Sequence, residues 1–205
     1  MKKLMKTLVA ASFAVLLLGC WTFTNVPGGQ QAEYGRIETD SDVIQFLAFS
    51  DDPDVCAIAI QNKQSQYPAR YALLLDGPAR EAMREALTKY ESWKGLAQEN
   101  QTAIVKTITK LELQQMFYQH GGWRDAGDRE ISLLFYSSID DNGNQSFSLE
   151  LKPYVWRGFY RVYGQDSLVL SDDQAITLGD LLSENALKDG YQKAKKKQDV
   201  INMFN

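Results

Sequence analysis

The strongest constraint on the fold is a change in the spacing of apolar residues along the chain. From Ala79 to Ala97 they recur every three or four positions, with mostly charged residues between them. This spacing predicts an amphipathic helix over about residues 78–98. Gly77-Pro78 suits a helix start, because proline has no amide hydrogen to lose there. The charged side of the helix is expected to face solvent.

The segments on either side of this helix have the short apolar runs and alternation typical of strands. We expect strands at 43–49, 55–60 and 71–75 before the helix, and at 102–117, 131–138, 146–152, 159–163 and 167–170 after it. Asn142-Gly143 predicts a hairpin turn. Residues 120–128 hold three glycines and are expected to form a loop.

A second helix is predicted near the C-terminal end, with Thr177 as its cap and Leu178, Leu181, Leu182 and Leu187 on one side. Gly190 is expected to stop or bend it. Residues 191–205 then form either a second helical piece or a frayed tail. The order of elements predicts an α+β fold: one domain over residues 42–205, with helices on one face of a largely antiparallel sheet of about 6–8 strands.

The first twenty residues have the features of an export signal. Lys2, Lys3 and Lys6 precede a run from Thr7 to Leu18 that is too short to span a bilayer. The segment ends Leu17-Leu18-Gly19-Cys20, which resembles the lipobox of bacterial lipoproteins. The resemblance implies that residues 1–19 are removed as a signal peptide and that Cys20 is lipidated. In bacterial lipoproteins, an aspartate directly after the lipidated cysteine favours retention in the inner membrane. Because Trp21 occupies that position here, the resemblance implies that the protein is located in the outer membrane.

Residues 20–41 are predicted to form the lipidated N-terminus and a flexible tether, since they show no apolar periodicity and contain Pro27-Gly28-Gly29. A flexible stretch of about 20 residues reaches roughly 25 Å. The domain is therefore expected to float clear of the membrane.

The charge of the mature chain argues against nucleic acid as a partner. Loss of three lysines with the signal leaves 19 basic against 26 acidic residues, a net charge of −7. The same balance disfavours docking on an anionic membrane surface. Cys56 would be the one cysteine left unmodified, so no internal disulfide is expected and the thiol is interpreted as a small buried hydrophobe, with an intermolecular disulfide or a reactive thiol as alternatives. We predict no metal site and no cofactor.

The richest cluster of chemical groups is the segment around His120, the one histidine of the chain. His120 could act as a general base oriented by Asp125 or Asp128. No Gly-x-Ser-x-Gly motif indicates a nucleophile, so a simple connection between strands is the favoured interpretation. As an intermediate possibility, Trp123 and Arg124 could belong to a recognition loop.

Aromatic residues alternate with Arg157 and Arg161 between residues 154 and 163. If these side chains are exposed, Trp156 and Tyr160 could stack on glycan or anchor a protein partner. The favoured alternative is that one face of this segment packs in the core. Asp140–Asn144 is interpreted as a turn, because the EF-hand pattern fails at Gln145 and Leu151.

These observations predict a cell-envelope lipoprotein, held in a membrane by lipid on Cys20 and more consistent with the outer than the inner membrane. Its expected role is non-enzymatic: the binding of an envelope protein or a cell-wall glycan. An envelope hydrolase using the His120 segment, or a carrier of a small molecule or cation, remains the alternative.

Overall fold

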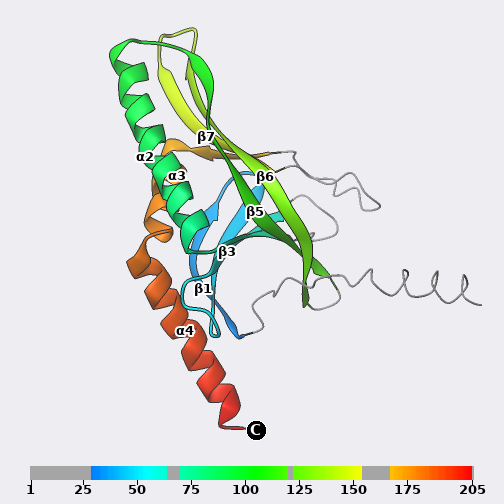
Figure 1. Ribbon diagram of the computed structural model, residues 1–205. Coiled ribbons are helices and arrows are strands. Elements are labelled where there is room, and N and C mark those ends of the chain that lie inside the picture. Colours follow the sequence, from blue (N-terminus) through cyan, green and yellow to red (C-terminus); the bar gives the residue numbers. More distant parts are fainter. Residues whose placement is uncertain (1–28, 64–69, 120–121, 154–166, 205) are drawn as a thin grey trace, which may run out of the picture.

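The fold is α+β, built on one sheet of eight antiparallel strands, as the sequence predicts (Figure 1). The computed structural model describes residues 29–63, 70–119, 122–153 and 167–204. The strands follow each other in sheet order: β1 Gln31–Glu38, β2 Asp42–Phe49, β3 Cys56–Asn62, β4 Arg70–Leu75, β5 Ile104–Gln119, β6 Gly122–Ile139, β7 Gln145–Pro153 and β8 Leu168–Ser171. The helices within these described residues are α2 Gly77–Glu99, α3 Asp172–Leu181 and α4 Glu184–Asn202.

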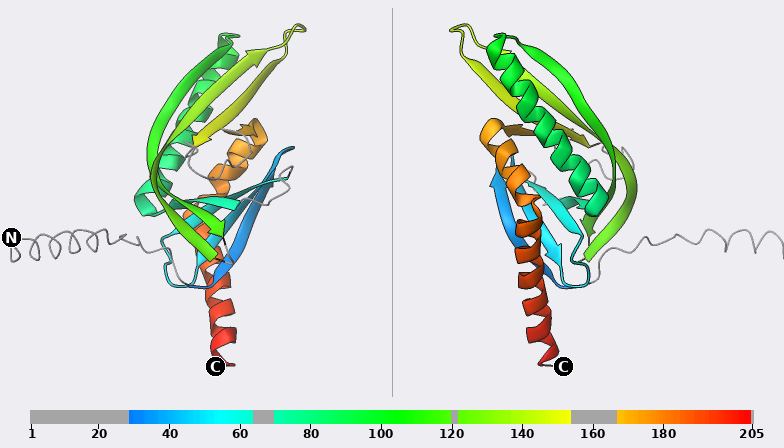
Figure 2. Two further views of the ribbon diagram at one scale, coloured as in Figure 1. Left: turned by 90° about the vertical axis from the view of Figure 1, so that its right-hand side faces the viewer. Right: turned by 60° about the vertical axis from the view of Figure 1, so that its left-hand side comes forward.

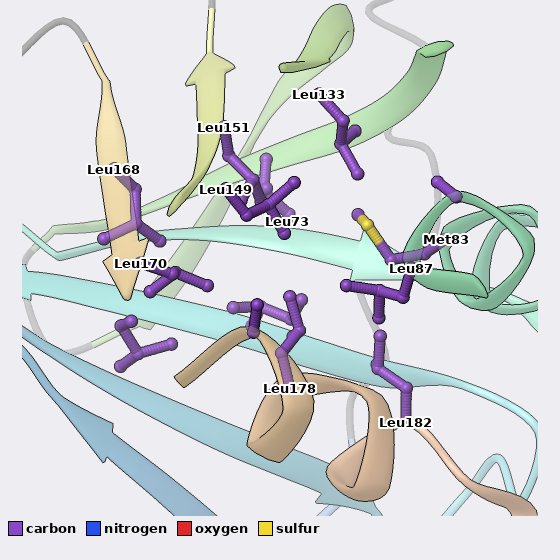
Figure 3. Packing of buried hydrophobic residues seen from close by; sticks show 14 of the residues in the cluster. Leu73, Met83, Leu87, Leu133, Leu149, Leu151, Leu168, Leu170, Leu178 and Leu182 are labelled. Carbon is purple, nitrogen blue, oxygen red and sulfur yellow. The ribbon is translucent and has the colours of Figure 1, made fainter. Parts of the chain in front are cut away.

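All three helices lie against one face of the sheet (Figure 2). Alternate strand residues project to this face, where they meet the apolar sides of α2 and α3. Figure 3 shows the contact layer, in which Leu73, Leu133 and Leu149 of the strands face Met83 and Leu87 of α2 and Leu178 and Leu182 beyond it. The main core is therefore the space between helices and sheet.

The opposite face of the sheet carries a smaller apolar cluster. Its buried members are Phe49, Ala57, Ala59, Ala72 and Met116, with Leu47, Leu74 and Trp123 packed beside them. Strand β4 contributes Leu73 and Leu75 to the main core and Ala72 and Leu74 to this cluster. The continuous apolar run in β4 thus reflects burial on both faces of the sheet.

Helix α2 is confirmed, and the residues at its start explain where it begins. The Asp76 carboxylate accepts a hydrogen bond from the Ala79 amide at 2.8 Å, and Pro78 occupies the first turn. Later in the helix, Lys94 Nζ lies 2.6 Å from Asp172 Oδ2 at the first residue of α3. This hydrogen bond, more than the nearby carboxylate charges, raises the pKa of Lys94.

Four sequence predictions are wrong in detail. Residues 31–38 of the predicted tether form β1, because Ala32 and Ile37 have a buried place beside β2. The predicted 120–128 loop belongs to β6 from Gly122 onward, where pairing with β5 overrides the glycines. Gly190 neither stops nor bends the last helix: α4 continues through it to Asn202, and the absent side chain lets Tyr34 and Ala48 approach.

The predicted cap of the C-terminal helix, Thr177, lies inside α3. The true cap is Ser171, whose hydroxyl accepts from the Gln174 amide while the Gln174 side chain accepts from the Ser171 amide. We expect Ser171→Ala to lower the free energy of unfolding by about 1 kcal/mol. The Thr177 hydroxyl donates within the helix to the Asp173 carbonyl, so Thr177→Ala should leave stability within about 0.5 kcal/mol of the parent. Urea unfolding of both variants checks this, and equal losses would contradict it.

Candidate functional site

Four of the residues selected from the sequence lie outside the described part of the chain: Cys20, His120, Trp156 and Tyr160. The predicted strand at 159–163 lies there too. Four others, Trp123, Arg124, Asp125 and Asp128, lie along β6. Their surroundings decide which of them are available to a ligand.

Trp123 is a packing residue. Its indole Nε1 donates to Gln31 Oε1 on β1 at 3.2 Å, and its ring meets Tyr118 edge to face at 5.4 Å. The ring also packs against the smaller apolar cluster. Half-buried and hydrogen-bonded, Trp123 joins the first strand to the sixth rather than presenting its face to solvent.

The neighbouring charged residues do not converge on one point. Arg124 alternates with Trp123 and Asp125 along the strand, so it projects to the other face, where it is exposed. Asp125 Oδ1 accepts from the Gly127 amide at 2.7 Å, inside an irregularity where β6 gains a residue relative to β5. Gly127 takes φ +78° there, which favours glycine. Asp125 thus shapes a bend in the hairpin, and Asp128 is exposed beyond it.

A hollow lined mainly by apolar residues lies elsewhere in the fold. The last turns of α2 and the first residues of β5 enclose an open hollow of about 350 Å³. We call it the Trp93 hollow; its apolar walls are Trp93, Leu96, Ala97, Ile104 and Phe135. Leu96 and Ile104 remain 55% and 40% exposed, so apolar surface faces solvent around the opening.

Two lysines give the hollow a positive charge. Lys89 Nζ lies 4.9 Å from the centre of the Trp93 ring, and Lys106 Nζ lies 4.7 Å from it. Lys89 also donates to the Ile108 carbonyl at 3.1 Å, which fixes it to β5. Lys106 lines the hollow itself and is exposed. The hollow is therefore complementary to a ligand that has an apolar part, for the apolar walls, and an acidic part, for the lysines.

The base of the Trp93 hollow is held by buried contacts. Phe135 packs edge to face against Trp93 at 6.1 Å and against Tyr90 at 5.5 Å. The Ser137 hydroxyl donates to the Thr102 carbonyl at 2.8 Å, and Gln145 Nε2 donates to the Ala97 carbonyl at 3.0 Å. The connection from α2 to β5 is thus anchored to β6 and β7.

A larger hollow of about 430 Å³ lies between α2 and α3 and has a different character. Its rim is the charged side of α2, with Glu81, Glu85 and Glu91, and Arg84 pairs with Glu81 at 2.9 Å. This matches the solvated helix face expected from the sequence. It offers less apolar wall relative to polar wall than the Trp93 hollow does.

Two buried titratable groups have structural explanations. Cys56 is fully buried under the helices, and burial raises the pKa of its thiol, so it is an inert core residue. For Glu150, burial alone would raise the pKa, but hydrogen bonds from Tyr136 and Ser167 together with Lys152 bring it below the usual value. Its carboxylate is thereby held ionised and bonded on the sheet face opposite the helices.

Within the described ranges, no cluster of three or more His, Cys, Asp or Glu residues is placed to hold a metal ion. None of the helices α2 to α4 has the length and apolar character needed to cross a bilayer. The chain matches no family model, and neither a curated protein nor a solved structure is significantly similar to it.

Most residues of the Trp93 hollow were assigned to the correct helix or strand from the sequence, but nothing in the sequence indicated that they form a hollow. Trp93, Leu96 and Ala97 read as the apolar side of α2, and Ile104 and Lys106 as part of a strand. One signal could have indicated it: Leu96 belongs to the apolar residues of α2 but stays 55% exposed, although its neighbour Ala97 is buried.

Proposed function

We propose that the protein is a lipid-anchored lipoprotein of the cell envelope whose domain binds a partner protein at the Trp93 hollow. The observation that carries the binding role is the hollow itself: an open apolar recess with a tryptophan wall, solvent-exposed Leu96 and Ile104 at its opening, and Lys106 at its edge. Exposed apolar surface around a pocket is typical of interaction sites. The lipid anchor rests on the resemblance of residues 1–20 to a lipoprotein signal.

The chemistry of the hollow favours a peptide segment with an apolar side chain next to an acidic one. The apolar side chain would occupy the space over Phe135, and the acid would pair with Lys106. Cell-wall glycan fits less well, because sugars stack on open aromatic faces and the Trp93 ring already has two lysines over it. A protein anchored by one side chain in a desolvated pocket is the common pattern of interface hot spots.

The envelope location follows from the same signal, with Trp21 favouring the outer membrane. The hydrolase alternative depends on His120. We expect His120→Ala to leave partner capture and any hydrolytic activity of the purified lipoprotein unchanged. Loss of a hydrolytic activity in that variant would replace the binding role by an enzymatic one.

Site-specific photocross-linking tests the binding role in the native envelope. A cross-linking residue placed at Ile104 should capture one protein in near-stoichiometric amount, and Leu96→Asp should reduce that capture at least about tenfold by placing a charge at the apolar opening. Ile176→Asp is the matched control, since Ile176 is 44% exposed on α3, outside the hollow. Capture that is absent, or equal in the two aspartate variants, would contradict the proposal.

A further inference from the structure

The last two turns of α4 leave the body of the protein. Up to Ala194 the helix packs on β1 and β2 through Leu187, Gly190 and Ala194, which are buried. From Lys195 onward almost every residue is exposed, and the helix projects past the end of the sheet (Figures 1 and 2). We call residues 195–204 the α4 tip.

The α4 tip combines exposed apolar residues with lysines. Met203 and Phe204 are 78% and 87% exposed, and Val200 and Ile201 are 45% and 40% exposed. Lys196 precedes Val200 by four positions and Lys197 precedes Ile201 by four, so these two apolar residues lie one turn beyond a lysine, and Met203 and Phe204 follow them. A helix end with apolar residues preceded by lysines suits a membrane interface. The apolar side chains can insert into the headgroup region while the lysine ammonium groups contact lipid phosphates.

The α4 tip lies beside the point where the expected tether joins the domain. Lys197 Nζ donates to the carbonyl of Gln31, the first residue of β1, at 3.2 Å. Phe204 follows seven residues later, about 10 Å along the helix direction. Because β1 begins at Gln31, the tether from Cys20 is only about ten residues long and spans at most roughly 35 Å. The lipid anchor therefore keeps this end of the molecule near the bilayer.

We propose that the α4 tip inserts into the membrane interface and fixes the orientation of the domain on the bilayer. Phe204, Met203 and Ile201 enter the headgroup region, and Lys193, Lys195 and Lys196 face anionic lipid phosphates. The C-terminal end of α2 and the β6–β7 turn lie at the other end of the molecule (Figure 1), so the end of α2 that borders the Trp93 hollow then lies far from the membrane. The inference rests on the lipid anchor of the proposed function and adds a second, non-covalent membrane contact.

The negative net charge of the mature chain does not oppose this contact. Electrostatic attraction acts over about 8 Å at physiological ionic strength, so local charge decides. Residues 193–204 hold four lysines and one acid, Asp199. From the body, Glu33 of β1 also faces Lys197, which leaves Lys193, Lys195 and Lys196 exposed for lipid. Each such lysine strengthens attraction to an anionic surface about fivefold.

A fluorescent label at residue 203 tests the contact in the full lipidated protein. Met203→Cys offers a selective thiol, because Cys20 carries lipid and Cys56 is fully buried. The protein is reconstituted into vesicles of phosphatidylethanolamine and phosphatidylglycerol that contain a headgroup-level spin-labelled lipid. We expect an environment-sensitive dye at residue 203 to shift to the blue and to lose roughly half or more of its emission to the spin label. The same dye at Asp141→Cys, in the exposed β6–β7 turn, should remain unquenched.

Two sets of variants separate the apolar from the electrostatic part. Ile201→Ser with Phe204→Ser should abolish the quenching of a dye at residue 203 in all vesicles, whereas Lys193, Lys195 and Lys196→Gln should reduce it in anionic vesicles. These residues are exposed, so the unfolding midpoint should not change. An unquenched label at residue 203 in the parent protein overturns the proposal. So does a label that is shielded only at high protein concentration, since a second copy would then cover the tip.

The outcome is independent of the rest of the proposed function. Co-flotation with vesicles and the mass of the N-terminal peptide report whether Cys20 carries lipid. Capture at Ile104 reports whether the Trp93 hollow binds a protein. A lipidated protein that captures its partner and leaves residue 203 in water would refute the α4 tip alone.

Discussion

Replacing Phe135 by alanine should lower the free energy of unfolding by about 3–5 kcal/mol. Phe135 is 1% exposed and lies where three rings meet: Tyr90 and Trp93 edge to face, and Phe147 stacked at 6.2 Å. Removing its ring leaves a cavity between α2 and β6 that a sheet and a 23-residue helix cannot close. Since domains are stable by only about 5–15 kcal/mol, this variant is expected to be close to unfolding at 37 °C.

Urea unfolding followed by tryptophan fluorescence measures the loss. Phe117→Ala is the matched control, because the same truncation is made in β5 at a ring that is 38% exposed and absent from both apolar clusters. It should cost about 1 kcal/mol or less. Phe135→Leu keeps most of the volume and should fold, while widening the Trp93 hollow and weakening partner capture. Similar losses in the two alanine variants would show that Phe135 is not the centre of this packing.

Gly190→Ala should destabilise the protein by about 1–3 kcal/mol, although alanine favours helix. A Cβ at residue 190 would lie 2.6 Å from Tyr34 Cδ1 and 3.0 Å from Ala48 Cβ. Ala48 is fully buried in β2 and Tyr34 is packed on Phe46 at 6.1 Å, so neither can move aside without disturbing the core. The added methyl group therefore pushes α4 away from β1 and β2.

Gly95→Ala provides the opposite sign in the same background. Gly95 lies within α2 and a Cβ there meets no atom within 4 Å, so the change should stabilise by about 0.5–1 kcal/mol through helix propensity. Thermal unfolding of both variants measures the difference. If Gly190→Ala also stabilised the protein, the close approach of α4 to Tyr34 would be refuted.

Local patterns predicted the elements with strong periodicity. The apolar side of α2, with the proline after Gly77, placed that helix within a residue or two of its true bounds. The alternation of Phe147, Leu149 and Leu151 placed β7, and Asn142-Gly143 marked the turn before it, where Gly143 takes φ +82°. These signals are local, since each depends on neighbours within one turn or one strand.

The predictions that failed depend on distant residues. Gly190 looked like a helix end because glycine favours the position after a helix, but its role is set by Tyr34, which is far away in the chain. The segment from Gly122 to Asp128 looked like a loop because of its glycines, yet six residue pairs with β5 hold it as strand. Residues 31–38 showed no clear period because only Ala32 and Ile37 are buried.

The candidate site illustrates the same division. The sequence predicted a candidate site around Trp123 because chemically reactive and aromatic residues cluster there. In the structure, Trp123 instead links β6 to β1 through its hydrogen bond to Gln31. The Trp93 hollow has no motif, because its walls come from α2, β5 and β6 and meet only after the sheet has formed.

The sequence by itself determined the α+β class, the place of α2 and the alternation of the strands, because all of these depend on the order of polar and apolar residues over short distances. The lipoprotein-like signal of residues 1–20 stays a prediction. Only the tertiary structure decided that β1 completes the sheet, that α4 passes through Gly190 and projects beyond it, and that a hollow forms around Trp93. Those features arise from the pairing of segments that are far apart in the chain. Short-range sequence patterns do not predict the free energy of that pairing.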